Sequence, residues 1–147
     1  MIVVGYQNTV LRPGNGNGMT IVGANNTVSG DSALAVGNQN NATNGAALAI
    51  GAGNTASGEA SIAVGNLANA TAIRSAAVGN NANALADGAS AYGSRANATG
   101  ENSVAISTNT TASGRNAVAV GSFSKAEGRN GTAVGTTSSA SGERASA

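Results

Sequence analysis

Several residue types that build metal centres, disulfides and aromatic cores are missing from this chain. The sequence contains no cysteine, no histidine and no tryptophan. Without cysteine there can be no disulfide bridge, and without cysteine and histidine the thiolate and imidazole ligands of metal sites are excluded. We therefore expect neither a disulfide framework nor a bound cofactor.

Charge and long apolar runs are also scarce. Charged residues make up 9% of the chain and the net charge is +1, which gives no electrostatic reason to expect a nucleic acid or an anionic membrane as partner. No apolar run approaches the roughly 18 residues of a membrane-spanning helix. The first residues lack the basic and apolar regions of a signal peptide. We expect either a cytosolic protein or a piece of a longer chain.

Large apolar side chains are too few for an ordinary core. Leu, Ile, Val and Phe make up about 16% of the sequence, under the roughly 20% that warns of disorder. That warning normally requires a high net charge as well, which is absent here. The chain must then bury small side chains in a thin core, or share its larger ones with a partner chain.

What the chain has instead is a repeat of 14 residues. An aliphatic residue followed by glycine recurs at this spacing from Val22-Gly23 to Val134-Gly135, with Tyr92-Gly93 and Ile106-Ser107 as variants. The residue before the aliphatic is alanine in every repeat but the first. Another alanine follows six residues after it, with the same exception. Such self-similarity at a fixed period is typical of a solenoid.

Each repeat has the pattern of two short strands. A segment such as Ala33–Gly37 alternates with period 2, which places Leu34 and Val36 on one face and Ala33 and Ala35 on the other. A second short segment surrounds the later alanine, and Gly, Asn and Ser are typical of the turns between. We predict an all-β fold, a parallel β-roll or solenoid with two short strands per coil.

Side-chain volume decides which face is inside. Only Ala and Ser fit between two facing strands of so short a coil, so the larger aliphatics must point outwards. A rod with a continuous apolar stripe is not expected to stay monomeric, and we predict self-association along the stripe. The predicted interface residues are Leu34, Val36, Leu48, Ile50, Ile62, Val64, Val78, Val104, Ile106, Val118, Val120 and Val134.

The first coil is irregular. Val4-Gly5 precedes Val22 by 18 residues, and the four extra residues fall within positions 11–15, where the single proline lies. Insertions in solenoids map to turns. We divide the single domain, residues 1–147, into an irregular first coil with an inserted loop (1–18) and regular repeats (19–147). The last repeat stops before its next aliphatic, which suggests a piece of a longer chain.

One segment resembles a known repeat. Asn102-Ser103-Val104-Ala105-Ile106-Ser107 is similar to the Asn-Ser-Val-Ala-Ile-Gly unit in the heads of YadA-like trimeric autotransporter adhesins, and similar units occupy about residues 16–147. The resemblance implies a left-handed parallel β-roll assembled as a homotrimer, with Val104 and Ile106 facing the trimer interior and Ala105 filling the roll. It also implies a head on the surface of a Gram-negative bacterium, with an outer-membrane anchor elsewhere in the full-length chain. Such heads attach to host cells, extracellular matrix or other surfaces and serve virulence.

The chain departs from that family in several places. Ser107 replaces the motif glycine, Tyr92 replaces the aliphatic residue, and Ala76 and Ser90 thin the apolar stripe. The family's neck motif, coiled-coil stalk and membrane barrel are not found in this sequence. We expect looser packing around residues 72–93.

Two columns of polar residues remain. Asp87 and Glu101 occupy the same position in adjacent repeats, roughly 5 Å apart, which resembles the carboxylate pair of a retaining glycosidase. With no cleft and no aromatic residue to stack a sugar, we interpret the column as solvated turn charges with weak ion pairs, and we do not expect an enzyme. The second column, Asn26, Asn40 and Asn54, predicts a stacked hydrogen-bond ladder.

Four functions compete. An adhesin head would place its ligand contacts on the exposed turns and second strands, and the notable basic residues Arg95, Arg115, Lys125 and Arg129 are the candidate ligand-contact surface. An ice-binding solenoid needs a flat face, commonly of aligned threonine, but the corresponding column mixes Thr, Asn, Lys and Ser. A purely structural spacer is the remaining alternative. An acyltransferase of the hexapeptide-repeat type would need a period of 6 and a histidine base, and this sequence has neither.

Overall fold

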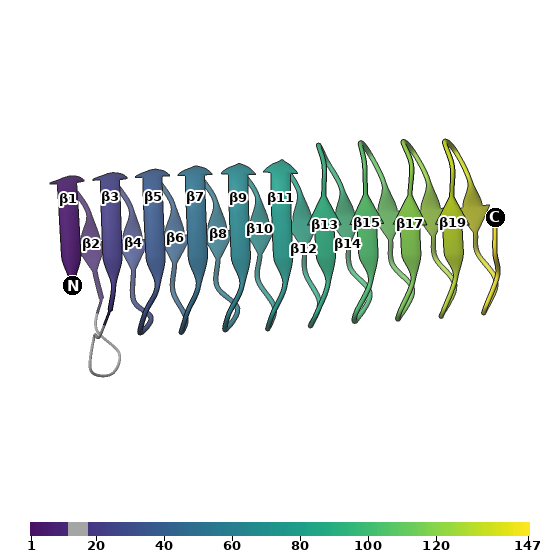
Figure 1. Cartoon of the computed structure of the whole chain (residues 1–147), viewed down its shortest axis with the longest axis horizontal. Helices are drawn as coiled ribbons and strands as arrows, with labels where there is room; N and C mark the ends of the chain where they lie inside the picture. The colour runs from purple at the N-terminus through teal and green to yellow at the C-terminus, as the bar shows by residue number, and fades with distance from the viewer. Residues whose placement is uncertain (12–17) are drawn as a thin grey trace.

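The chain winds into a solenoid whose coils stack along one axis, with the two termini at opposite ends of the rod (Figure 1). The computed structural model describes residues 1–11 and 18–147. Within these residues every coil contributes one longer and one two-residue strand, and there is no helix. The predicted parallel β-solenoid with two short strands per coil is confirmed. The predicted inserted loop lies, apart from Leu11, outside the described residues.

The strands alternate along the chain between two parallel ten-stranded sheets. The first sheet holds the longer strands, β1 (Ile2–Tyr6), β3 (Thr20–Ala24), β5 (Leu34–Asn38), β7 (Leu48–Ala52), β9 (Ile62–Asn66), β11 (Ala76–Asn80), β13 (Ser90–Tyr92), β15 (Val104–Ile106), β17 (Val118–Val120) and β19 (Thr132–Val134). The second sheet holds the two-residue strands, β2 (Thr9–Val10), β4 (Thr27–Val28), β6 (Asn41–Ala42), β8 (Thr55–Ala56), β10 (Asn69–Ala70), β12 (Asn83–Ala84), β14 (Asn97–Ala98), β16 (Thr111–Ala112), β18 (Lys125–Ala126) and β20 (Ser139–Ala140).

The register of the sheets follows the repeat. From β3 onwards each residue pairs with the residue one repeat later, as Ala35 does with Ala49. Between the first two coils the offset is 18 residues instead, both for Ile2 with Thr20 in the first sheet and for Val10 with Val28 in the second. The four extra residues are therefore taken up between β2 and β3.

The interior of the coil is made mostly of alanine, with a smaller number of buried Asn, Ser and Thr residues. Ala35 from the first sheet and Ala42 from the second are both fully buried, and the equivalent alanines of later coils are buried in the same way. Larger interior side chains, Met19, Ile21 and Val28, fill the first regular coil. A buried methyl or methylene group contributes only about 0.8 kcal/mol, so each coil is stabilised largely by backbone hydrogen bonds to its neighbours.

The turns require unusual backbone conformations. After the longer strands, Gln39, Leu67 and Arg95 stand in the same position of their coils, each with φ of 57°, in the left-handed region that non-glycine residues adopt only at a cost. Two residues before this position lies the repeat glycine. A Cβ added at Gly51 would stand 1.9 Å from the carbonyl oxygen of Gly65 in the next coil, which explains why glycine recurs there.

The middle of the rod keeps its interior packing. Ala77, Ala84 and Ala91 are fully buried, so the looser packing expected around residues 72–93 is not found inside the coil. The thinning is confined to the outer face, where Ala76 and Ser90 stand in place of larger aliphatics.

Candidate functional site

The outer face of the first sheet carries the large aliphatic side chains. In β7, Leu48 and Ile50 are only partly buried while Ala49 between them is fully buried, because successive side chains of a strand point to opposite faces. The same alternation holds in the other longer strands from β3 onwards. All twelve predicted interface residues lie on this face, and their exposure reaches 39% for Ile62 and 59% for Val134.

The face extends beyond the residues that the sequence pattern selected. Val22 and Tyr92 lie in the same column as Val36 and Ile50, and both are exposed large side chains. At the amino-terminal end, Val4 pairs with Val22 and prolongs the column. The predicted interface omitted Val4 and Val22 because they stand beside the insertion, and it omitted Tyr92 because it is not aliphatic. We call the whole surface the aliphatic face.

The four basic residues predicted to contact a ligand do not form one cluster. Arg115 and Arg129 occupy the same position in successive turns that lead into longer strands, whereas Arg95 lies in a turn that follows one and Lys125 lies on β18. Arg115 forms an ion pair with Glu101, with Nε and Oε2 3.3 Å apart. Such half-exposed pairs contribute about 0–1 kcal/mol.

Arg129 pairs with a carboxylate in the same column, Glu143, at 3.8 Å between Nη1 and Oε1. Asp87 and Glu101, the adjacent carboxylates, turn in opposite directions along the rod. Asp87 accepts a hydrogen bond from the backbone N–H of Ile73 in the preceding coil at 3.1 Å, while Glu101 pairs with the following coil. This arrangement matches the predicted column of turn charges and not a converging catalytic pair.

A ladder of buried asparagine side chains runs along the first coils, as predicted. Asn40 Nδ2 donates to Asn26 Oδ1 at 3.1 Å and to the carbonyl oxygen of Gly51 at 2.9 Å. Its Oδ1 in turn accepts a hydrogen bond of 2.9 Å from Asn54 Nδ2. The ladder begins at Asn8, one coil earlier than the sequence pattern indicated.

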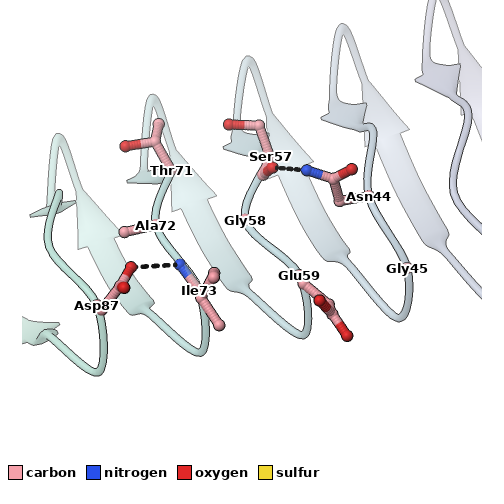
Figure 2. A pocket seen from close by; sticks show the side chains of 9 residues that line it. All are labelled: Asn44, Gly45, Ser57, Gly58, Glu59, Thr71, Ala72, Ile73 and Asp87. Carbon is pink, nitrogen blue, oxygen red and sulfur yellow. Dashed lines mark hydrogen bonds between the residues drawn. The ribbon is translucent and has the colours of Figure 1, made fainter.

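A shallow hollow of about 410 Å³ opens on the turns that lead from short to longer strands (Figure 2). It spans four successive coils and is lined by Asn44, Gly45, Ser57, Gly58, Glu59, Thr71, Ala72, Ile73 and Asp87. The side chain of Asn44 donates a hydrogen bond to the backbone oxygen of Ser57 within it. The sequence did carry a signal for this hollow, because an isoleucine at position 73 interrupts a column of charged residues and glycine.

The comparison with protein families decides the classification. The model of the YadA head domain repeat matches residues 22–40, 29–54, 42–68, 70–96, 84–106, 98–124 and 126–147, nearly the whole chain. The chain belongs to the YadA head family. No individually characterised protein gives a significant match. The YadA head repeat is that of trimeric autotransporter adhesin heads, so the resemblance noted in the sequence is confirmed.

The segment that first suggested the resemblance alternates between the inside and the outside of the coil. Ala105 is fully buried inside the coil, while Val104 is half-buried and Ile106 is exposed on the aliphatic face. Over residues 1–11 and 18–147 there is no helix long and apolar enough to cross a membrane. The same residues contain no group of three acidic side chains that could hold a metal ion.

Proposed function

We propose that this chain forms part of the head of a trimeric autotransporter adhesin, a non-catalytic module that assembles with two further copies and attaches the bacterium to a surface. Membership of the YadA head family supports this function. The observation that carries it is the aliphatic face, which repeats in register from coil to coil on the outside of a chain whose own interior, beyond its first regular coil, holds no large apolar side chain among the described residues.

Three copies bring their aliphatic faces together around a common axis in this proposal. The single chain covers Leu48 and Ile50 only in part. Burying the exposed remainder of such a side chain contributes on the order of 1 kcal/mol, and the contribution recurs in nearly every coil. The twelve predicted interface residues, together with Val22 and Tyr92, form the proposed interface.

The turns and the second sheet face outwards in such a trimer and are the proposed contact surface for host cells, extracellular matrix or other surfaces. Arg95 and Lys125 form no ion pair within the described residues, whereas Arg115 and Arg129 each lie beside a carboxylate. We therefore expect Arg95 and Lys125 to carry more of any contact with an acidic ligand. The anchor in the outer membrane lies elsewhere in the full-length chain.

Attachment can be separated from a purely structural spacer role by competition. The purified chain, in excess, should reduce the attachment of bacteria that display the full-length protein to a matrix-coated surface, because it occupies the same receptors. A chain in which Arg95 and Lys125 are both replaced by glutamine should compete less well. If the folded chain does not compete at any concentration, the spacer function is favoured instead.

A further inference from the structure

Ile73, an exposed aliphatic residue of the hollow, interrupts a column of turn residues that is otherwise charged or glycine from residue 31 onwards. The column of Leu85 holds Ser, Thr and Glu from residue 29 onwards and Leu11 in the first coil. Ile73 is 45% exposed and Leu85 is 46% exposed, so neither contributes to the interior of the coil. Leu85 follows Thr71, a residue of the hollow, by one repeat. Ile73 therefore places apolar surface in the hollow, whereas Leu85 lies outside the residues that line it.

Two carboxylates flank this apolar surface. Glu59 lies one coil before Ile73 and Asp87 one coil after it, in the same column (Figure 2). The hydrogen bond from the Ile73 N–H holds the Asp87 carboxylate over the coil of Ile73. In the described part of the chain neither carboxylate has a basic partner within ion-pair distance, in contrast to Glu101 and Glu143. Arg74, the basic residue that directly follows Ile73, does not line the hollow.

The spacing of these groups selects the kind of cation that fits. Positions two coils apart are about 9.6 Å from each other, and the lean of Asp87 shortens the gap to its carboxylate. A Ca²⁺ ion needs six to eight oxygen ligands at about 2.3–2.6 Å, which two such carboxylates do not provide. A guanidinium or ammonium group at the end of a methylene chain bridges a longer distance and also covers apolar surface.

We propose that the hollow binds an arginine or lysine side chain of a partner protein. The methylene groups of that side chain lie on Ile73, and its cationic end lies between Glu59 and Asp87. The inference deepens the proposed adhesive function and rests on it for placing the partner on the target surface. In a trimer the hollow is present three times, so weak single contacts combine into a stronger attachment.

The binding is tested on the whole chain by NMR of its isoleucine methyl groups. Titration with the peptide acetyl-Gly-Arg-Gly-amide should shift the Ile73 methyl signal and leave that of Ile106, on the aliphatic face, in place. Replacing both acids, Glu59→Gln with Asp87→Asn, should weaken the apparent affinity about fivefold or more, since two charge-assisted contacts are lost. The matched control, Glu127→Gln, removes an exposed carboxylate outside the hollow and should leave the affinity unchanged.

Three outcomes would overturn the proposal. One is an unchanged Ile73 signal up to millimolar peptide, and another is an equal shift with a peptide that carries norleucine in place of arginine. The third is a loss of the oligomer in the double variant, which would mean that the occupant is a second copy of this chain. Because the titration does not depend on attachment, it can succeed even if the competition experiment fails, and the two proposals are tested separately.

Discussion

Ser107 occupies the backbone position where every other described coil has glycine. Its φ is 115°, close to the 123° of Gly121 in the next coil. A Cβ added at Gly93, one coil earlier, would stand 2.4 Å from the carbonyl oxygen of Ser107, which shows how closely coils approach in this column. Side chains rarely adopt such a φ, and holding one there costs on the order of 1–3 kcal/mol.

Replacing this serine by glycine should therefore stabilise the protein. Ser107→Gly relieves the strain, partly offset by the roughly 0.5–1 kcal/mol of chain entropy that glycine loses on folding. We expect the free energy of unfolding to rise by about 1 kcal/mol, measured by urea denaturation at a fixed protein concentration. Ser113→Gly, at an exposed turn serine without positive φ, serves as the control and should be slightly destabilising. An equal loss of unfolding free energy in both variants would mean that the backbone of Ser107 is not strained.

Buried serines in the turn column differ in their hydrogen bonding. The hydroxyl of Ser75 donates to the carbonyl oxygen of Ala72 at 2.7 Å, whereas the buried hydroxyl of Ser103 has no partner. Equivalent positions hold alanine at 89 and 117, so a methyl group fits there. Ser103→Ala should raise the free energy of unfolding by about 1 kcal/mol, because an unpaired buried polar group is removed.

Ser75→Ala is the matched comparison for this prediction. It removes a hydroxyl that has a partner and should leave stability unchanged or lower it by up to about 1 kcal/mol. Thermal melts followed by circular dichroism, at the same protein concentration, measure both variants. If Ser103→Ala lowers the melting temperature as much as Ser75→Ala does, the Ser103 hydroxyl has a partner after all.

At the scale of single elements, the asparagine ladder links coils that share few large side chains. Its recurrence at 26, 40 and 54 made it predictable from the sequence. Its first member, Asn8, was not predicted because the insertion shifts that coil by four residues. The ladder ends at Ala68, whose backbone N–H donates to Asn54 Oδ1 at 2.9 Å, and alanine at that position already indicates the end. The shortening of the longer strands from β13 onwards coincides with a change after the repeat glycine position, from Asn or Ala in β5 to β11 to Ser or Thr from Ser94 onwards.

Asn40 is the residue on which the ladder can be tested. Asn40→Ala removes hydrogen bonds on both sides and should lower the free energy of unfolding by about 2–4 kcal/mol. Asn40→Asp should cost more at neutral pH, because a buried carboxylate would face the carbonyl oxygens of Val36 and Gly51, to which Asn40 Nδ2 now donates.

The aspartate variant should depend on pH in a defined direction. Burial raises the pKa of the introduced carboxyl above its unfolded value, so the folded state is favoured at low pH and loses stability as pH rises through the folded-state pKa. Urea denaturation between pH 4 and pH 8 should show the gap between Asn40→Asp and Asn40→Ala widening with pH. The exposed Asn38→Asp should show no such trend. If the difference in stability between Asn40→Asp and Asn40→Ala does not change with pH, the ladder is not buried at position 40.

At the scale of the whole molecule, the 14-residue period was sufficient to predict the architecture, because each coil repeats the same choice of small residues inside and large residues outside. The basic residues show the limit of that reasoning. They all fall within residues 95–129, yet the coil distributes them over different turns and strands. The hollow was missed for a related reason, since Glu59, Ile73 and Asp87 come together only when successive coils are stacked.

The aliphatic face makes a specific prediction for assembly. Val64→Asp places a charge in the middle of the proposed interface, where it would be buried without a partner. We expect this variant to lose the oligomer or to melt at a lower temperature, as followed by sedimentation and circular dichroism. Asn66→Asp, on the same strand and exposed, is the control. Identical behaviour of the two variants would mean that the face is not an interface.

Sedimentation equilibrium of the unmodified chain tests the central claim most directly. One chain has a mass of 13.9 kDa, and the account predicts a single folded species of three times that mass over a wide concentration range. Circular dichroism of the same sample should show β structure, so that an unfolded monomer is not mistaken for a negative result. A stable, folded, β-rich monomer would contradict the proposal that the aliphatic face is shared among three chains.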